Sequence, residues 1–191
     1  MAKNRLIISF NGQEGSGKST IATLVAEKLG IPRYYMGQLF RDMAKEHGLD
    51  LPEFRKICDQ DPSFDKKVDD YVVALPDKHE NFVIESRTAW HFIPQSIKIY
   101  LQVEPAAAAE RIFKGLAGKN NRSNEDANLD TVENIRKSIL KRRMEDNERY
   151  FALYGIRQDE IKNYDFVIDT TKLTIAEVFE KVITFINEKS A

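Results

Sequence analysis

The residues best suited to chemistry lie at positions 12–20, where glycines, a lysine and hydroxyl side chains follow one another closely. This segment, here called the P-loop, reads Gly12-Gln13-Glu14-Gly15-Ser16-Gly17-Lys18-Ser19-Thr20 and fits the pattern G-x-x-x-x-G-K-[ST]. Its glycines permit backbone dihedrals that turn consecutive N–H groups toward phosphate oxygens. Lys18 would reach the β- and γ-phosphates of ATP, and the Ser19 hydroxyl would bind Mg²⁺. We therefore expect the P-loop to bind nucleotide phosphates.

The P-loop pattern requires a strand before it and a helix after it. Residues 6–10 form an apolar run of strand length, and residues 21–29 carry apolar side chains at helical spacing. The N-terminus of that helix would direct its positive dipole at the phosphates. A chance match in a turn is the alternative, and the strand-to-helix context argues against it.

The composition of the whole chain narrows the class of protein. Its 191 residues predict one domain, 1–191, with a core of its own. The formal net charge of −1 gives no indication of nucleic-acid or anionic-membrane binding, and no apolar run could span a bilayer. The single cysteine, Cys58, excludes an internal disulfide and is expected to pack as a small apolar residue. We expect a cytoplasmic protein that acts as a monomer.

Apolar periodicity organises the rest of the chain as alternating strands and helices. Further strands are expected at residues 34–35, 82–84, 97–103 and 166–169. Helices are expected at 37–45, from 51, from 61, at 104–114, at 131–154 and after Thr174. Such alternation predicts an α/β P-loop fold with a five-stranded parallel sheet covered by helices on both faces.

Three places in this fold are candidates for substrate binding. Residues 36–78 form a helical block, and residues 115–130 are polar and turn-forming, which is typical of a mobile lid. Ligands of a parallel sheet bind at the carboxyl ends of its strands. At those ends the sequence places Glu85, Arg87 and Asp169 beside the P-loop.

A P-loop alone does not identify a reaction, because switches, motors, regulators and kinases all carry one. The guanine-reading pattern N-K-x-D is absent, which disfavours a GTPase switch. The strand at 82–84 is followed by Glu85, Ser86 and Arg87 and not by two acidic residues, which disfavours an oligomeric ATPase. A small-molecule kinase fits best, and a nucleotide-binding regulator without turnover is the alternative.

The acceptor of such a kinase is either a phosphate or a hydroxyl group. A phosphate acceptor needs cations that offset its repulsion by the γ-phosphate, preferably arginines with forked donors, as Arg41 and Arg87 could supply. A hydroxyl acceptor needs a carboxylate that takes its proton, for which Glu85 is available. From the residues alone, both possibilities stay open.

Several motifs in order along the chain resemble cytidylate kinases, in particular the short archaeal type. The motifs are the P-loop, Gly37-Gln38-Leu39-Phe40-Arg41, residues 61–69, Val83-Ile84-Glu85-Ser86-Arg87-Thr88-Ala89-Trp90, Arg149-Tyr150 and residues 164–170. The resemblance implies a nucleoside monophosphate kinase with strand order 2-3-1-4-5, Mg·ATP as donor and CMP or dCMP as acceptor. It implies that residues 36–78 bind the acceptor and that residues 115–130 form the lid.

The resemblance also implies roles for individual side chains. Arg41 and Arg87 would hold the acceptor phosphate, Arg142 and Arg149 would contact the transferring phosphates, and Asp146 would face the acceptor. Arg111 would reach ATP. Two positions near Arg111 depart from the pattern, since Ala108 and Gly115 stand where arginines are expected, and Met36 replaces a small or hydroxyl residue.

The helix at 131–154 carries two competing stripes. Arg142, Asp146 and Arg149 continue an apolar stripe that begins at Ile135 and Ile139, which would direct these charges inward. A second apolar stripe contains Leu140, Met144 and Phe151. Periodicity leaves open which stripe faces the core.

Overall fold

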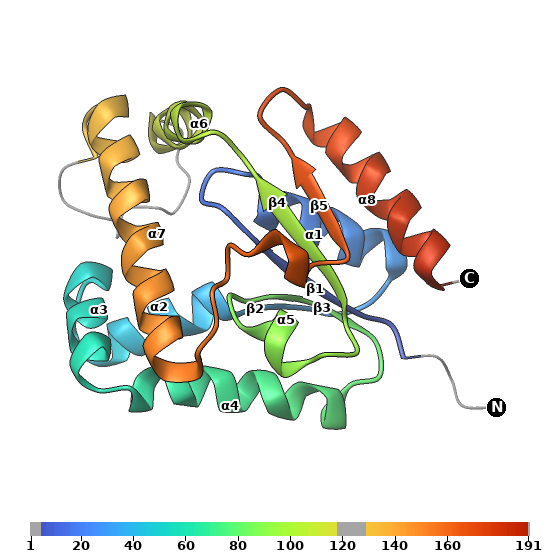
Figure 1. Cartoon of the computed structure of the whole chain (residues 1–191), viewed down its shortest axis with the longest axis horizontal. Helices are drawn as coiled ribbons and strands as arrows, with labels where there is room; N and C mark the ends of the chain where they lie inside the picture. The colour runs from blue at the N-terminus through green and yellow to red at the C-terminus, as the bar shows by residue number, and fades with distance from the viewer. Residues whose placement is uncertain (1–4, 118–128, 191) are drawn as a thin grey trace.

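The structure, a computed structural model, describes residues 5–117 and 129–190. Within these residues, five strands form one sheet in the order β2-β3-β1-β4-β5, as expected (Figure 1). The strands are β1 Ile7–Gly12, β2 Arg33–Tyr35, β3 Phe82–Glu85, β4 Ile97–Gln102 and β5 Phe166–Asp169. All four pairings are parallel. The fold prediction is therefore confirmed.

The strand register brings the candidate residues to one edge of the sheet. Phe10 in β1 lies opposite Glu85 in β3, and Gly12 lies opposite Leu101 in β4. Because the strands are parallel, their carboxyl ends meet, and the P-loop emerges beside the segment that follows Glu85.

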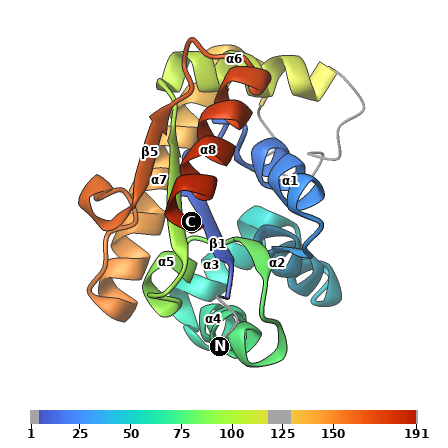
Figure 2. The ribbon, with the colours of Figure 1, turned by 90° about the vertical axis from the view of Figure 1, so that its right-hand side faces the viewer.

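Helices cover both faces of the sheet, as Figures 1 and 2 show. On one face, α1 Lys18–Leu29 and α8 Ile175–Ser190 pack on a core that contains Phe10, Val25 and Val182. On the other face, α4 Ser63–Lys78 and α5 Ala89–Phe92 pack on a core that contains Phe82 and Leu75. The short helix α5 and a 3₁₀ turn at Ile161–Asn163 were not expected from the sequence.

The helical block at 36–78 contains α2 Met36–Glu46, α3 Leu51–Gln60 and α4. Asp50 begins α3 with a capping box in which its side chain accepts from the Glu53 amide and Glu53 accepts from the Asp50 amide. Cys58 is buried beside Phe54 in a small core of this block, which confirms that it packs as an apolar residue. The block thus has a core that is separate from those of the sheet.

The remaining helices are α6 Pro105–Ala117 and α7 Val132–Tyr154. In α7, Ile135, Ile139 and Asp146 are buried, whereas Met144 and Phe151 are more than half exposed. The stripe that carries the charged residues therefore faces inward. Helix α6 continues to Ala117, so the expected lid at 115–130 begins in helix, and residues 118–128 lie outside the described residues.

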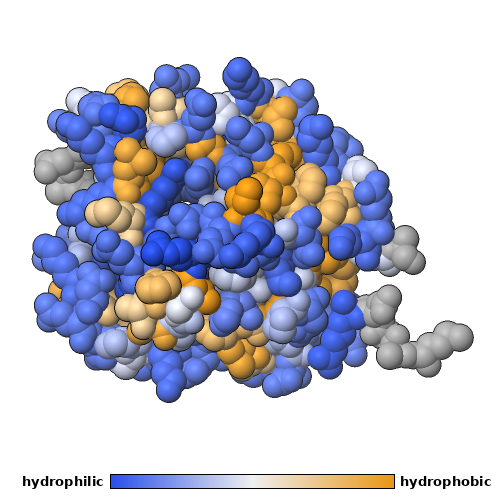
Figure 3. All heavy atoms as spheres, viewed as in Figure 1, coloured by the Kyte–Doolittle hydropathy of each residue, from blue (hydrophilic) through white to orange (hydrophobic). Residues whose placement is uncertain are grey.

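No helix within the described ranges is both long and apolar enough to cross a membrane. The side of the molecule seen in Figure 3 is mostly hydrophilic, with hydrophobic areas between the charged side chains.

Candidate nucleotide and acceptor site

Two glycines let the P-loop lie against neighbouring backbone. Gly12 has φ 146°, and an added Cβ would lie 2.4 Å from the Leu101 carbonyl oxygen. Gly15 has φ 76°, and an added Cβ would lie 2.9 Å from the backbone and side chain of Ala108. Ala108 is fully buried under the P-loop. The close packing of Gly15 on Ala108 therefore requires a glycine in the P-loop at this point.

The P-loop ends at the N-terminus of α1, whose first residue is Lys18. Gly17 provides no side-chain cap, so the first amides of α1 have no intrahelical acceptor and can bind an anion. Lys18 Nζ donates to the Gly12 carbonyl at 3.2 Å and lines the cavity described below. Burial lowers the pKa of Lys18, and the carboxylates of Glu85 and Glu14 oppose that shift.

Ser19 lies beside the carboxylate that ends β3. Its hydroxyl donates to Glu85 Oε2 at 2.7 Å, and Arg33 Nε donates to Glu85 Oε1 at 2.6 Å. Glu85 is 1% exposed, and these two hydrogen bonds provide a partner for each of its buried oxygens. Ser19 and Glu85 form a pair of hard oxygen donors beside the phosphate-binding amides, which suits Mg²⁺.

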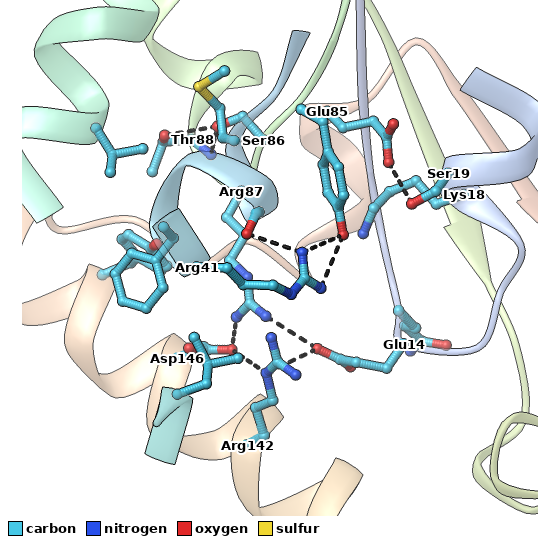
Figure 4. Close-up of a pocket in the computed structure, with 18 of the residues that line it drawn as sticks. Glu14, Lys18, Ser19, Arg41, Glu85, Ser86, Arg87, Thr88, Arg142 and Asp146 are labelled. Atoms are coloured by element: carbon cyan, nitrogen blue, oxygen red, sulfur yellow. Dashed lines mark hydrogen bonds and ion pairs between the residues drawn. The ribbon is translucent and has the colours of Figure 1, made fainter. Parts of the chain in front are cut away.

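A cavity of about 220 Å³ connects the P-loop with α2, α3, α4, α7 and the loop after β3 (Figure 4). Its lining contains the cations Lys18, Arg41, Arg55, Arg87, Arg142 and Arg149. Gly12, Ser16 and Arg111, three of the residues expected to bind ATP, do not line it. The other expected site residues do, so residues far apart in the sequence are brought to one cavity.

Asp146 organises the arginines on one side of this cavity. It forms an ion pair with Arg87, and its other oxygen accepts from Arg149 at 3.1 Å. Arg142 Nε lies 3.9 Å from Asp146 Oδ2. Asp146 is 2% exposed, so one buried carboxylate holds guanidinium groups from α7 and from the loop after β3. This arrangement makes Asp146 a positioning residue for the arginines.

Glu14 approaches the same arginines from the P-loop (Figure 4). Its carboxylate lies 3.2 Å from Arg87, 3.7 Å from Arg142 and 3.2 Å from Arg143. Burial alone would raise the pKa of Glu14, but Arg142, Arg87 and Lys18 lower it to about 2. The carboxylate is therefore ionised at neutral pH and surrounded by positive charge.

The far end of the cavity lies in the helical block. Arg41 donates to the Tyr35 hydroxyl at 3.1 Å and to the Gly37 carbonyl at 3.0 Å, and it points into the cavity (Figure 4). Met36 also lines this end and packs in the core below it. Two buried carboxylates of α4, Asp65 and Asp69, complete the lining here.

Asp65 and Asp69 have different partners. Asp69 accepts from Thr88 Oγ1 at 2.5 Å and from the Tyr154 hydroxyl at 2.6 Å. Asp65 Oδ2 lies 3.3 Å from Arg149 Nε and accepts no hydrogen bond from a described residue. Burial raises the pKa of both carboxyls, an effect that Arg149 opposes at Asp65. Asp65 thus retains capacity to accept a hydrogen bond from a ligand.

Arg111 lies outside the cavity and ties the P-loop to the loop after β5. It donates to the carbonyls of Thr170 at 2.6 Å, Thr171 at 3.1 Å and Gly15 at 3.3 Å. Arg111 therefore holds the backbone of the P-loop to the backbone of the loop after β5.

Sequence reasoning assigned no role to Arg33, Arg55, Asp65, Asp69 or Arg143, although Asp65 and Asp69 belong to the motif at residues 61–69. One signal was available for two of them, because Asp65 and Asp69 lie on the same stripe of α4 as the buried Val72. Arg33 and Arg143 had no such signal, since their partners Glu85 and Glu14 are distant in sequence.

The family model that matches this chain is that of the cytidylate kinase-like family, over residues 7–172. A cytidylate kinase of Pyrococcus horikoshii is 35% identical over 180 residues, which cover 94% of this chain and 87% of that protein. One of Methanocaldococcus jannaschii is 34% identical over 187 residues, which cover 95% and 98% of the two chains. Among solved structures, a shikimate kinase from Bacteroides thetaiotaomicron is similar with a TM-score of 0.64 at 12% identity, covering 95% of this chain and 98% of that one.

Proposed function

Because this chain belongs to the cytidylate kinase-like family and is an ATP-dependent nucleoside monophosphate kinase, we propose that its acceptor is CMP or dCMP. The product would be CDP or dCDP. The observation that carries this proposal is the one cavity that Lys18, Arg87, Arg142 and Asp65 line together.

The charges along this cavity fit a phosphate acceptor. A phosphate is already an anion, so its attack requires cations and correct placement but no base. Lys18 lies on the donor side, Arg41 and Arg87 would hold the acceptor phosphate, and Arg142 and Arg149 would stabilise the phosphoryl group in transfer. Closure of such a site excludes water and protects ATP from hydrolysis.

The placement of Glu85 disfavours a hydroxyl acceptor. Its oxygens are engaged by Ser19 and Arg33, on the donor side of the cavity. A general base must be within hydrogen-bond reach of the proton that it removes. The structural similarity to shikimate kinases, at 12–18% identity, concerns the fold alone.

Ser19 and Glu85 are the residues that we propose to hold Mg²⁺, directly or through water. Within the described residues, no group of three or more His, Cys, Asp or Glu side chains could hold a metal ion, which favours an ion bound largely by nucleotide phosphates and water. Bound Mg²⁺ would neutralise charge on the β- and γ-phosphates.

The preference for cytosine rests on the acid residues of α4. Cytosine carries an amino group at C4, where uracil carries a carbonyl oxygen. A buried carboxylate accepts a hydrogen bond from the amino group and repels the carbonyl. Asp65 offers such an acceptor in the part of the cavity that α4 lines.

Three further properties belong to the same proposal. The first is that the protein acts as a monomer, as expected from the sequence. The net charge of −1 supports small-molecule partners and no nucleic acid. The free thiol of Cys58 and the nucleotide substrates support a cytoplasmic location.

A panel assay tests the proposal. The protein is incubated with Mg·ATP and, separately, cytidine, CMP, dCMP, UMP or AMP, and ADP and the phosphorylated product are quantified. We expect CMP or dCMP to give the highest kcat/KM, and Asp65→Asn to reduce the ratio of CMP to UMP turnover. Equal use of UMP, or turnover of cytidine alone, would contradict the acceptor assignment. Absence of ADP with every acceptor would favour a nucleotide-binding regulator.

A further inference from the structure

We propose that the carboxylate of Glu14 is a built-in competitor that occupies Arg87 and Arg142 until the acceptor phosphate displaces it. This inference rests on the proposed function, since it assigns the residues that the acceptor phosphate must share or displace. It concerns binding, whereas the proposed function concerns which acceptor reacts.

The first observation is the number of arginines around one carboxylate. Glu14 Oε1 lies 3.2 Å from Arg87 and 3.7 Å from Arg142, and Oε2 lies 3.2 Å from Arg143 Nε. The Glu14 side chain is 20% exposed and lines the cavity. Arg87 and Arg142 also line the cavity, whereas Arg143 does not. A carboxylate and a phosphate present similar oxygen pairs to guanidinium groups, so Arg87 and Arg142 can hold either anion.

The second observation is that two carboxylates hold these arginines from different sides. Asp146 is 2% exposed and lies on α7 with Arg142, so it forms part of the wall. Glu14 lies on the P-loop and extends toward the arginines across the cavity (Figure 4). Because Gly12 and Gly15 pack against β4 and α6, a rotation of the Glu14 side chain can free the arginines without moving the loop.

The third observation is an excess of positive charge around Glu14. Its single carboxylate lies beside the guanidinium groups of Arg87, Arg142 and Arg143. A phosphate monoester brings three terminal oxygens and up to two negative charges to Arg87 and Arg142, whereas Glu14 brings two oxygens and one charge. A phosphate therefore pairs with these two cavity arginines better than Glu14 does and can displace it.

Binding measurements without transfer test the inference. Calorimetry at fixed ionic strength compares wild type with Glu14→Gln, which keeps the size of the side chain and removes its charge. We expect Glu14→Gln to bind CMP and inorganic phosphate about 10-fold more tightly and to bind cytidine, which lacks a phosphate, as wild type does. Glu27→Gln, an exposed change on α1, serves as the control for net charge.

A second variant tests the arginines that Glu14 occupies. Arg142→Gln should weaken CMP and inorganic phosphate binding about 10-fold, and Lys141→Gln, an exposed neighbour on α7, should not. Circular dichroism verifies the fold of each variant.

The different ligands and variants in these measurements separate this inference from rival explanations. Unchanged or weaker phosphate and CMP binding in Glu14→Gln would overturn it, even if wild type phosphorylates CMP as proposed. Tighter binding restricted to the non-hydrolysable analogue of ATP would assign the competition to the γ-phosphate and also overturn it. Tighter inorganic phosphate binding together with no turnover of CMP would support the inference while the proposed acceptor fails.

Discussion

The hydroxyl of Ser19 and the carboxylate of Glu85 are joined by a hydrogen bond of 2.7 Å between the first turn of α1 and the end of β3. The bond brings together the two residues that we propose to hold Mg²⁺, although they lie 66 residues apart in the sequence. Arg33 engages the other oxygen of Glu85, so that carboxylate is directed at the P-loop and away from the acceptor.

Lys18→Ala should abolish transfer and leave the fold intact. Lys18 faces the cavity, and loss of one preorganised charged donor in such a site lowers kcat by at least about 100-fold. ADP release and circular dichroism are compared with those of Lys28→Ala, an exposed lysine on the same helix. Turnover close to that of wild type would remove Lys18 from catalysis.

Arg87→Lys should impair CMP phosphorylation more than Glu85→Gln. Lysine keeps the charge but loses the fork that spans Asp146 and the acceptor phosphate, at a cost of about 1.5–3 kcal/mol, or roughly 10- to 150-fold in kcat/KM. Glu85→Gln should mainly raise the Mg²⁺ concentration needed for half-maximal rate, since no proton is removed from a phosphate acceptor.

Both variants are assayed by kcat across a range of Mg²⁺ concentrations. If the Glu85→Gln defect is the larger one and persists at saturating Mg²⁺, Glu85 acts as a base and the phosphate-acceptor assignment is wrong.

Gly15→Ala should destabilise the protein by about 2–4 kcal/mol. Its φ of 76° strains an L-residue, and the added Cβ would overlap Ala108. Gly48→Ala is the matched control, because Gly48 has φ 69° but open space around it, and it should cost about 1 kcal/mol. Urea unfolding measures the free energy of unfolding of both variants. Equal losses of free energy would show that the Gly15–Ala108 contact contributes nothing to the cost of Gly15→Ala.

Cys58 should resist alkylation in the folded protein. Burial raises the pKa of its thiol to about 12, which at pH 8 leaves about 1000-fold less thiolate than the usual value of 9.0. Labelling with iodoacetamide, followed by mass spectrometry, should be slow in the folded protein and fast in urea. CMP should slow the labelling further, because α3, which carries Cys58, borders the cavity. Rapid labelling without urea would contradict this packing.

Glu14 should stabilise the fold at neutral pH and lose that effect in acid. Its pKa of about 2 lies below the usual value of 4.5 for a glutamate, so the contribution is present above pH 4.5 and disappears as the pH falls toward 2. The shift corresponds to about 3 kcal/mol. The difference in unfolding free energy between wild type and Glu14→Gln should therefore be largest at pH 6 and shrink at pH 3, and a constant difference would refute the ionic origin.

The local pattern of the chain was sufficient for the fold and for the P-loop. A strand, a glycine-rich turn and a helix are consecutive in sequence, so the contacts that define the P-loop are short-range and readable from residue order. The alternation of strands and helices similarly predicted the parallel sheet, and the resemblance implied its order, which the structure confirms.

Tertiary structure decided how the charged residues pair, because pairing depends on contacts between segments far apart in the chain. Periodicity could not choose between the two stripes of α7, and packing against α6 and the sheet buried the one that contains Asp146. Periodicity also could not show that Arg33 contacts Glu85 or that Glu14 lies among three arginines. These contacts join β2 to β3 and the P-loop to α7, so they exist only once the chain has folded.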